Sequence, residues 1–489
     1  MPLKILLIDA NSSWLAGKES LRDLEQIIPP LGLMYISAYL RRQFKDDVDV
    51  RLINMVADCR DQNALREALE IFNPGIVGIR GMNIYKEIFH EAAGTVKRFC
   101  PGIIVAGGGP YVTMDLRDAA ADRNVDLFVV GEGEACFAEL VERILDGRDL
   151  SGLAGTAGWK NGKFIVNRPR EPVKDLDTLP FPDYERISME KYGGFVSYGY
   201  NRRRQAVIFS SRGCPFHCIY CHNIFGKDFR MRSARNIFLE IEALFKKCAI
   251  KDFYFIDDNF NLDYGRAMEM FDLIIKSRLK INIYFANGIR GDIIDKPFVD
   301  KMVEAGVIWV DFSVETASLR LQKFIKKFVD LDKIAENIHY ACGKGIMVNC
   351  CVMAGFPTET AEEAMLTVDF LKQFKKIVLP MFFSVKYYPH TEIYALALAE
   401  GVKPADIRKA CGGAYHDIKY SGTPLIPKKV FRDIYFRFLR EVFLSKERLL
   451  NAVEIQKKFL STQEILDVYS IFFRKRVKDL RKDVLYYAK

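Results

Sequence analysis

"SSRGCPFHCIYCHNIFG", residues 210–226, places three of the chain's 11 cysteines within eight positions. Cys214, Cys218 and Cys221 have the spacing C-x3-C-x2-C and follow a predicted strand, in a stretch that also holds Gly and Pro. Three thiolates on one tight loop can bind three irons of a cubane cluster, for which four cysteines are the usual complement. The loop therefore predicts a cluster in which one iron stays open to another ligand.

Three other interpretations of these cysteines remain open at this point. "CIYCH", residues 218–222, matches the C-x-x-C-H pattern of haem attachment, but it leaves Cys214 without a role, and no export signal is present. Zinc takes N and S ligands, with His222 as the fourth. Three unrelated structural cysteines are the last alternative, and their close spacing argues against it.

Downstream of about residue 205, short apolar segments alternate with helical patterns. Six of them predict strands: "QAVIFSS", "DFYFIDD", "INIYFANG", "WVDFSVE", "MVNCCVMAG" and "LPMFFSVKYY". Strands that alternate with helices imply a parallel sheet. We therefore expect a partial (β/α)6 TIM-type barrel over residues 201–400.

The cysteine loop, with the aromatic Tyr220 directly before its last cysteine, resembles the cluster loop of the radical S-adenosylmethionine (SAM) superfamily. The resemblance covers roughly residues 200–400. It implies a 4Fe–4S cluster held by the three cysteines, SAM bound to the open iron through its amino and carboxylate groups, and reductive cleavage to a 5′-deoxyadenosyl radical. It also implies a partial barrel, in agreement with the six predicted strands.

Other residues match the superfamily's SAM contacts in order along the chain. The resemblance implies that the ends of the second to fifth strands supply Asp257 and Asp258, Asn287 and Arg290, Ser313 and Glu315, and Gly355 and Pro357. For the two aspartates a solvated turn is the alternative, and Gly-Pro turns are common in any chain. Because parallel barrels place their sites at the carboxyl ends of the strands, these residues belong to one cavity.

Residues 1–150 also alternate strand and helix signals, which predicts a doubly wound, flavodoxin- or Rossmann-like domain and makes the whole chain α/β. "PPLGLMYISAYL", "VAGGGPYVTM" and "VVGEGEACFAEL" resemble the cobalamin-binding domain that often precedes a radical SAM barrel. The resemblance assigns cobalamin contacts to the ends of two predicted strands, at Gly107, Gly108, Gly109, Pro110, Gly131 and Glu132. A nucleotide-binding Rossmann domain lacks its G-x-G-x-x-G here, and a degenerate domain without cofactor is the other alternative.

One feature departs from the cobalamin pattern. Some cobalamin proteins carry D-x-H-x-x-G after the second strand, with the histidine on cobalt, but this region is "VADCRD". Neither Cys59 nor Arg60 is a histidine, and His90 lies downstream in a helical stretch. We expect the lower cobalt face to lack a histidine ligand, and Cys59 to be a simple loop thiol.

The remaining segments set the surroundings of these two modules. Residues 151–200 predict a linker with a β-hairpin at "KNGK", and residues 401–489 predict a basic helical domain with 20 Lys plus Arg against 10 Asp plus Glu. Amphipathic helices of this kind either cap the barrel or lie on an anionic membrane. No RNA-binding module is recognisable, so no nucleic-acid partner is expected. The residues Tyr387, Tyr388 and His390 either line the substrate space or belong to the core.

The start "MPLKILLIDA" reads as a buried strand, and no apolar run reaches the roughly 18 residues of a spanning helix. We therefore expect a cytoplasmic protein, membrane-associated at most through its basic C-terminal helices, with reduced cysteines.

The two modules together imply an anaerobic enzyme that methylates an unactivated carbon through methylcobalamin and the 5′-deoxyadenosyl radical. A small-molecule, tetrapyrrole or lipid-like substrate and a low-potential electron donor, such as ferredoxin or flavodoxin, follow from the resemblance. The alternatives are a radical cyclisation, ring contraction or oxidation without methyl transfer, as in the anaerobic tetrapyrrole cyclases, and a non-catalytic cobalamin or iron–sulfur sensor.

Overall fold

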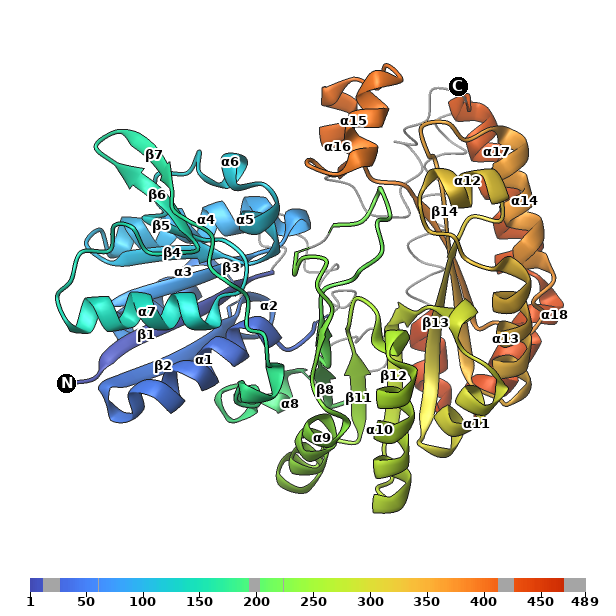
Figure 1. Ribbon diagram of the computed structural model, residues 1–489, viewed down its shortest axis with the longest axis horizontal. Coiled ribbons are helices and arrows are strands. Elements are labelled where there is room, and N and C mark those ends of the chain that lie inside the picture. Colours follow the sequence, from blue (N-terminus) through green and yellow to red (C-terminus); the bar gives the residue numbers. More distant parts are fainter. Residues whose placement is uncertain (12–26, 60, 193–202, 223, 412–425, 470–489) are drawn as a thin grey trace.

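The computed structural model describes residues 1–11, 27–59, 61–192, 203–222, 224–411 and 426–469. Two α/β units lie side by side, the N-terminal unit in blue to teal and the barrel in green to red (Figure 1). The loop with the three cysteines and the short helices α15 and α16 lie between them, above the barrel strands in this view.

The N-terminal sheet has seven strands in the order β2-β1-β3-β4-β5-β6-β7. The first five are parallel and have the flavodoxin-like order, which confirms the predicted doubly wound fold. The strands are β1 (Leu3–Ala10), β2 (Val48–Asn54), β3 (Ile76–Gly81), β4 (Ile104–Gly108), β5 (Leu127–Val129), β6 (Thr156–Lys160) and β7 (Lys163–Val166).

Helices cover both faces of this sheet because the apolar residues of β1 point alternately to either side. Leu6 and Ile8 pack against α3 and α4, whereas Ile5 and Leu7 pack against α1 and α7. The helices are α1 (Leu31–Phe44), α2 (Met55–Asp58), α3 (Gln62–Phe72), α4 (Lys86–Phe99), α5 (Pro110–Met114), α6 (Leu116–Ala119) and α7 (Glu134–Leu145). The glycine-rich turns of this unit follow the carboxyl ends of β3, β4 and β5.

The hairpin at "KNGK" is part of the first sheet. β6 pairs antiparallel with β5, and β7 pairs with β6. The chain then reaches the barrel through α8 (Met189–Tyr192) and a stretch in which Tyr184 is buried, with its hydroxyl bonded to the backbone of Val207. This stretch therefore packs against the barrel core.

The second sheet has six parallel strands in the order β15-β14-β13-β12-β11-β8, which confirms the predicted partial barrel. They are β8 (Gln205–Ile208), β11 (Asp252–Phe255), β12 (Asn282–Ile289), β13 (Val307–Glu315), β14 (Met347–Ala354) and β15 (Leu379–Ser384). Between β8 and β11, the two-residue strands β9 (Ser211–Arg212) and β10 (Arg230–Met231) form a separate antiparallel ladder.

Each helix of the barrel begins at a Ser, Thr or Asp whose side chain accepts a backbone N–H, which explains the sharp strand-to-helix turns. These caps are Ser233, Asp263, Asp295, Ser318, Asp330 and Thr360. The helices are α9 (Ala234–Cys248), α10 (Tyr264–Ser277), α11 (Lys296–Glu304), α12 (Leu319–Phe324), α13 (Leu331–Gly343) and α14 (Ala361–Lys372).

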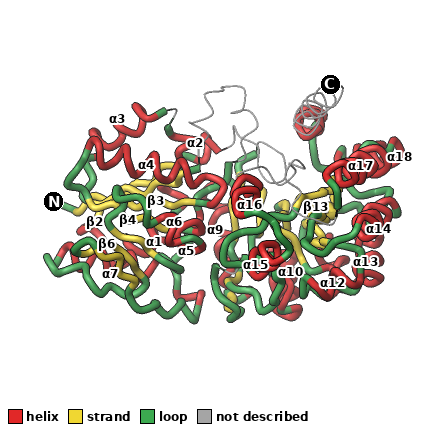
Figure 2. Tube along the Cα trace, turned by 90° about the horizontal axis from the view of Figure 1, so that it is seen from above, coloured by secondary structure: helices red, strands yellow, loops and turns green. Residues whose placement is uncertain are grey.

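The C-terminal part supplies α15 (Glu392–Ala399), α16 (Pro404–Cys411), α17 (Lys428–Phe438) and α18 (Lys446–Gln456), with a π-helical turn at Leu439–Phe443. The predicted apolar face of α17 is buried in the barrel's hydrophobic core, where Phe382 of β15 contacts Phe431, Tyr435 and Phe438. Figure 2 shows α17 and α18 beside α14 at the edge of the barrel. None of the described helices has the length and apolar content needed to span a bilayer. The basic segment 471–487 lies outside the described residues.

Candidate active site

The loop with the three cysteines, residues 213–229, is closed at its base by the β9–β10 ladder. Gly213 begins the loop at φ +88°, where a Cβ would collide with the Asp228 carbonyl, so the turn requires glycine. The loop is tied to the barrel because Ile219 N donates to Ile325 O at 3.2 Å, and its carbonyl accepts from Ile393 N at 3.0 Å. Both the end of α12 and the start of α15 therefore hold the loop in place.

The three thiols are free, and Cys218 Sγ lies 3.8 Å from the Lys326 carbonyl oxygen. Desolvation raises the pKa of the half-buried Cys214. Within the described residues, no three His, Cys, Asp or Glu side chains converge on a single ion. In a cubane each of the three thiolates would bind an iron of its own.

Two of the SAM candidates lie against the loop. Asp258 accepts a hydrogen bond from the backbone of Gly213, and desolvation together with Asp257 raises the pKa of Asp258 to about 6. The Arg290 guanidinium lies 4.2 Å from the centre of the Phe216 ring, and it forms an ion pair with Asp292 at 2.9 Å. Arg290 therefore packs on the outside of the loop rather than presenting a free charge.

A buried ion pair lies next to the loop at the end of β13. Glu315, at φ +67°, accepts from Lys327 Nζ at 2.9 Å, and both side chains are largely buried. Burial and Glu315 raise the pKa of Tyr220, whose ring also contacts Phe356 at 6.3 Å. Although burial opposes it, Glu315 and Cys218 raise the pKa of Lys327, which keeps a cation beside the thiols.

The turn after β14 contains a buried carboxyl group that forms no ion pair with another described residue. Gly355, at φ +100°, donates its N–H to Glu359, and Phe356 N donates to the same oxygen at 3.3 Å. Pro357 is buried in the same turn. Glu359 is fully buried, and its Oε1 has no hydrogen-bond partner, so desolvation raises its pKa to about 8.

This raised pKa gives a testable pH dependence. The folded chain keeps the Glu359 proton where the unfolded chain has lost it, so stability falls as the pH rises from the ordinary glutamate range through about 8. Glu359→Gln removes that loss. We expect the thermal midpoint of the wild type to fall between pH 5.5 and 8.5 by about 2 °C more than that of the variant. Exposed Glu400→Gln is the control, and equal falls for the wild type and Glu359→Gln would contradict the assignment.

The structure places the other barrel candidates differently. Asp257 is buried, and its Oδ1 accepts hydrogen bonds from Ser210 N and Oγ at 2.9 Å and from Ser211 Oγ at 2.6 Å, while its Oδ2 is buried without a hydrogen-bond partner among the described residues. Asn287 donates to the Asp257 carbonyl at 2.8 Å. Ser313 is half-buried and lies against Gly288, where any side chain would meet its hydroxyl.

The three residues after the last strand separate into core and surface positions. Tyr387 is a core residue whose hydroxyl donates to the Gly355 carbonyl. Tyr388 is half-buried, and its ring lies 4.6 Å from the ring of His222 on the cysteine loop. His390 is largely exposed and lies 3.9 Å from Asp115 of the N-terminal unit. Only Tyr388 is therefore both partly accessible and next to the loop.

In the N-terminal unit, the ends of β4 and β5 present bare backbone. Gly109 at φ +87° and Gly131 at φ +86° adopt the left-handed conformation that glycine tolerates best. A Cβ on Gly131 would meet no atom within 4 Å, and one on Gly108 would meet only Val129, at 3.6 Å. Gly107 is buried against Phe89, and Pro110 opens α5. Gly108 and Gly131 are half-buried and leave room for a large group at the strand ends, the place predicted for cobalamin.

Two side chains of the N-terminal unit that could approach cobalt are hydrogen-bonded or buried in the structure. His90, the only histidine in residues 1–200, has Nδ1 2.9 Å from Asp122 and Nε2 2.9 Å from the Tyr111 hydroxyl. Cys59 is buried, and desolvation raises its pKa to about 12, which keeps it a neutral thiol. Arg60 lies outside the described residues. That the lower cobalt face lacks a histidine ligand stays a prediction.

Glu132 has partners that the sequence did not indicate. Its carboxylate forms ion pairs with Arg212 at 2.9 Å and with Arg230 at 2.5 Å, both of which come from the barrel ladder. Glu134 forms a third ion pair, with Arg212 at 2.5 Å. Although burial opposes it, these arginines lower the pKa of Glu132. Its carboxylate therefore joins the two units.

Sequence reasoning missed several of these residues. Lys327 lies in the turn after α12 and Glu359 in the turn between β14 and α14, and the burial of Glu359 is not visible in the sequence. For Arg212, Arg230 and Glu134 no local pattern exists, because their partners are about 80 to 100 residues away.

The comparisons with known proteins agree with both units. Residues 208–371 match the radical SAM superfamily, and residues 20–141 match the B12 binding domain. An uncharacterised methyltransferase of Pyrococcus horikoshii is 30% identical over 381 residues, which cover 76% of this chain and 79% of the relative. The cytidylyl-2-hydroxyethylphosphonate methyltransferase of Streptomyces wedmorensis is 25% identical, with 76% and 77% covered. The anaerobic magnesium-protoporphyrin IX monomethyl ester cyclase of Rubrivivax gelatinosus is 26% identical, with 68% and 60% covered.

Solved structures show the same fold. The radical SAM methyltransferase TsrM of Kitasatospora setae, solved with cobalamin and a 4Fe–4S cluster, has a TM-score of 0.66 at 18% identity, with 80% of this chain and 74% of that chain covered. The cobalamin-dependent radical SAM enzyme OxsB has a TM-score of 0.65 at 15% identity, with 99% and 72% covered. The cofactors of the chain are a 4Fe–4S cluster, SAM and cobalamin. The chain belongs to the cobalamin-dependent radical SAM enzymes related to methyltransferases.

Proposed function

We propose that this enzyme methylates an unactivated carbon of a small-molecule substrate held between the cysteine loop and the N-terminal unit. The observation that carries the proposal is the direct attachment of the two units: the turn after β5, with the bare backbone of Gly131, is bonded to the ladder that begins the cysteine loop. When bound, the cluster with SAM supplies hydrogen-atom abstraction, and cobalamin supplies the methyl group.

Different residues of the chain would bind the cluster, SAM and cobalamin. Cys214, Cys218 and Cys221 hold the cluster, and the Lys327–Glu315 pair places a balanced charge beside it. Asp258 and the turn at Gly355 would contact SAM, while the glycines at the ends of β4 and β5 would leave room for cobalamin. Apolar residues of α15 and α16 pack over Ile219 and Phe356, which keeps water from that side of the loop.

A second outcome is a radical cyclisation without methyl transfer, favoured by the similarity to the Rubrivivax gelatinosus cyclase. The two outcomes differ in their products. Methyl transfer consumes SAM twice and yields both 5′-deoxyadenosine and S-adenosylhomocysteine. A cyclisation yields only 5′-deoxyadenosine. A tetrapyrrole or lipid-like substrate and a ferredoxin or flavodoxin donor are part of the proposal in both cases.

The experiment is an anaerobic turnover of the reconstituted full chain with candidate substrates, a chemical reductant and labelled SAM. We expect 5′-deoxyadenosine and S-adenosylhomocysteine in equal amounts with methylated product. 5′-Deoxyadenosine without S-adenosylhomocysteine, for every accepted substrate, would replace methylation by the cyclase-type reaction. Absence of both products under reducing conditions, with cluster and cobalamin present, would leave a non-catalytic sensor.

A further inference from the structure

The base of the cysteine loop brings two arginines together. In the β9–β10 ladder, Arg212 is the direct cross-strand partner of Arg230. Their side chains are only 6% and 8% exposed, so water screens their repulsion weakly. Like charges directly opposite each other destabilise a strand pair. The ladder closes residues 213–229, so the loop needs negative charge at this point.

The N-terminal unit supplies that charge. Glu132 bonds to both arginines, through Oε2 to Arg212 and through Oε1 to Arg230, and Glu134 bonds to Arg212. Glu132 directly follows Gly131 in the turn after β5, and Glu134 is the first residue of α7. Their side chains are 10% and 5% exposed. Two buried cations and two buried carboxylates therefore compensate one another across the contact between the units.

The segment after the N-terminal sheet completes the contact. Val173 donates its N–H to Glu132 at 3.2 Å, and its carbonyl accepts from Arg230 Nη1 at 2.5 Å. Arg230 also donates to the Phe225 carbonyl at 3.3 Å, inside the loop itself. One glutamate thus connects the turn after β5, the stretch after β7 and the cysteine loop.

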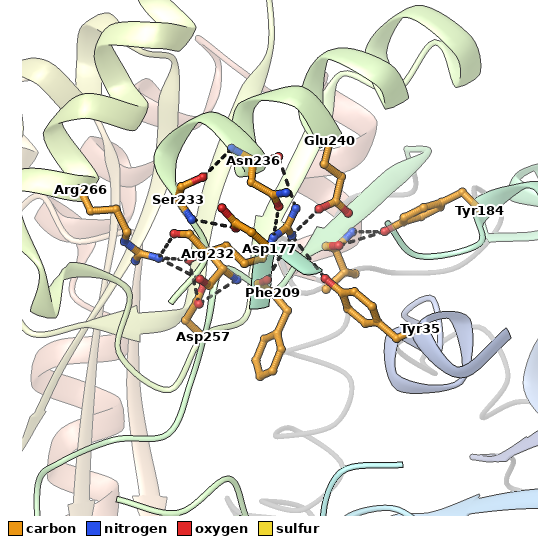
Figure 3. Close-up of polar contacts among 12 residues, drawn as sticks. Tyr35, Asp177, Tyr184, Phe209, Arg232, Ser233, Asn236, Glu240, Asp257 and Arg266 are labelled. Atoms are coloured by element: carbon orange, nitrogen blue, oxygen red, sulfur yellow. Dashed lines mark hydrogen bonds and ion pairs between the residues drawn. The ribbon is translucent and has the colours of Figure 1, made fainter. Parts of the chain in front are cut away.

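A neighbouring network surrounds Arg232, directly after β10 (Figure 3). Arg232, two residues beyond Arg230, pairs with Glu240 and donates to the Tyr35 hydroxyl of α1 at 3.3 Å. Arg266 donates to the Ser210 carbonyl at 2.8 Å. These contacts fix residue 210 and the start of α9, with Glu240 and Arg266 coming from the barrel and Tyr35 from the N-terminal unit. The positive charge of Arg212 and Arg230 is instead neutralised by carboxylates of the N-terminal unit.

We infer that Glu132 and Glu134 are positioning residues: they supply the negative charge that the ladder requires and so hold the N-terminal unit on the base of the cysteine loop. Closure of the loop then depends on docking of the unit that carries the glycine-rich strand ends. This inference goes beyond the proposed function, because it holds whether the enzyme transfers a methyl group or cyclises its substrate.

Hydrogen exchange of the full chain, followed by mass spectrometry, tests the inference. Glu132→Gln leaves two opposed arginines without their shared carboxylate, and we expect exchange of the amides of residues 213–229 to rise at least about tenfold. Glu134→Gln keeps the carboxylate of Glu132, and it should raise the exchange of these amides only about threefold. Lys191→Gln is the matched control, because it breaks the Lys191–Asp58 pair at 2.6 Å between the linker and the N-terminal unit. It should leave exchange of the loop unchanged.

A double variant distinguishes charge compensation by Glu132 from a general structural role of its side chain. In Glu132→Gln/Arg230→Gln the repulsion is gone, and loop exchange should return to within about threefold of the wild type. A double variant no better than Glu132→Gln would overturn the inference. It would also be overturned if Glu132→Gln left loop exchange unchanged and weakened binding of hydroxocobalamin tenfold, since Glu132 would then contact cobalamin directly.

Discussion

Cys218→Ala is expected to remove the cluster and to lower 5′-deoxyadenosine formation more than about 100-fold, because only two cysteines of the loop would then remain to hold the cubane. Cys218 is the central cysteine of the three. Iron per chain after anaerobic reconstitution, together with the charge-transfer absorption of the cluster, measures the loss. Iron should fall from about four per chain to less than one.

The matched control is Cys248→Ala, which removes a half-buried thiol at the end of α9, away from the loop. It should keep the iron content of the wild type. If Cys218→Ala kept both its iron and its 5′-deoxyadenosine formation, the three-cysteine assignment would fail. If it lost zinc instead of iron, the zinc interpretation would return.

Gly108→Leu is expected to weaken cobalamin binding at least about 30-fold while the fold persists. Gly108 ends β4 with ordinary strand geometry, and a Cβ there would meet only Val129 at 3.6 Å. The added side chain therefore has room in the free protein, but it occupies the space that cobalamin needs. Equilibrium binding of hydroxocobalamin to the full chain, followed by its visible spectrum, measures the change.

Gly102→Leu serves as the control, because a Cβ on this exposed glycine would meet nothing within 4 Å. Its cobalamin affinity and thermal midpoint should equal those of the wild type. Unchanged affinity in Gly108→Leu would move the cobalamin site away from the end of β4. A midpoint lowered by more than about 5 °C would show that the substitution damages the sheet itself.

The two predicted folds depended on patterns that are local in the chain. Alternating runs such as "LKILLIDA" and "DFYFIDD" become strands because β-branched and aromatic residues suit a sheet covered on both faces. The face of α17 was readable for the same reason, since Phe431, Ile434 and Phe438 repeat with the helical period. The hairpin at residues 156–166 was recognised as a hairpin, but its attachment to β5 is a pairing that no local pattern encodes.

By itself, the sequence determined which segments form strands along the chain, the cysteine loop and the glycines at the strand ends of the first unit. These features could be predicted because spacing and glycine placement act within a few residues. Only the tertiary structure decided which charges meet. In the folded chain Asp257 accepts hydrogen bonds from Ser210 and Ser211, and Glu132 forms ion pairs with two arginines of the barrel. Such partners are chosen by packing between segments far apart in the chain, where burial makes an unpaired charge costly and the fold alone brings the opposite charge within reach.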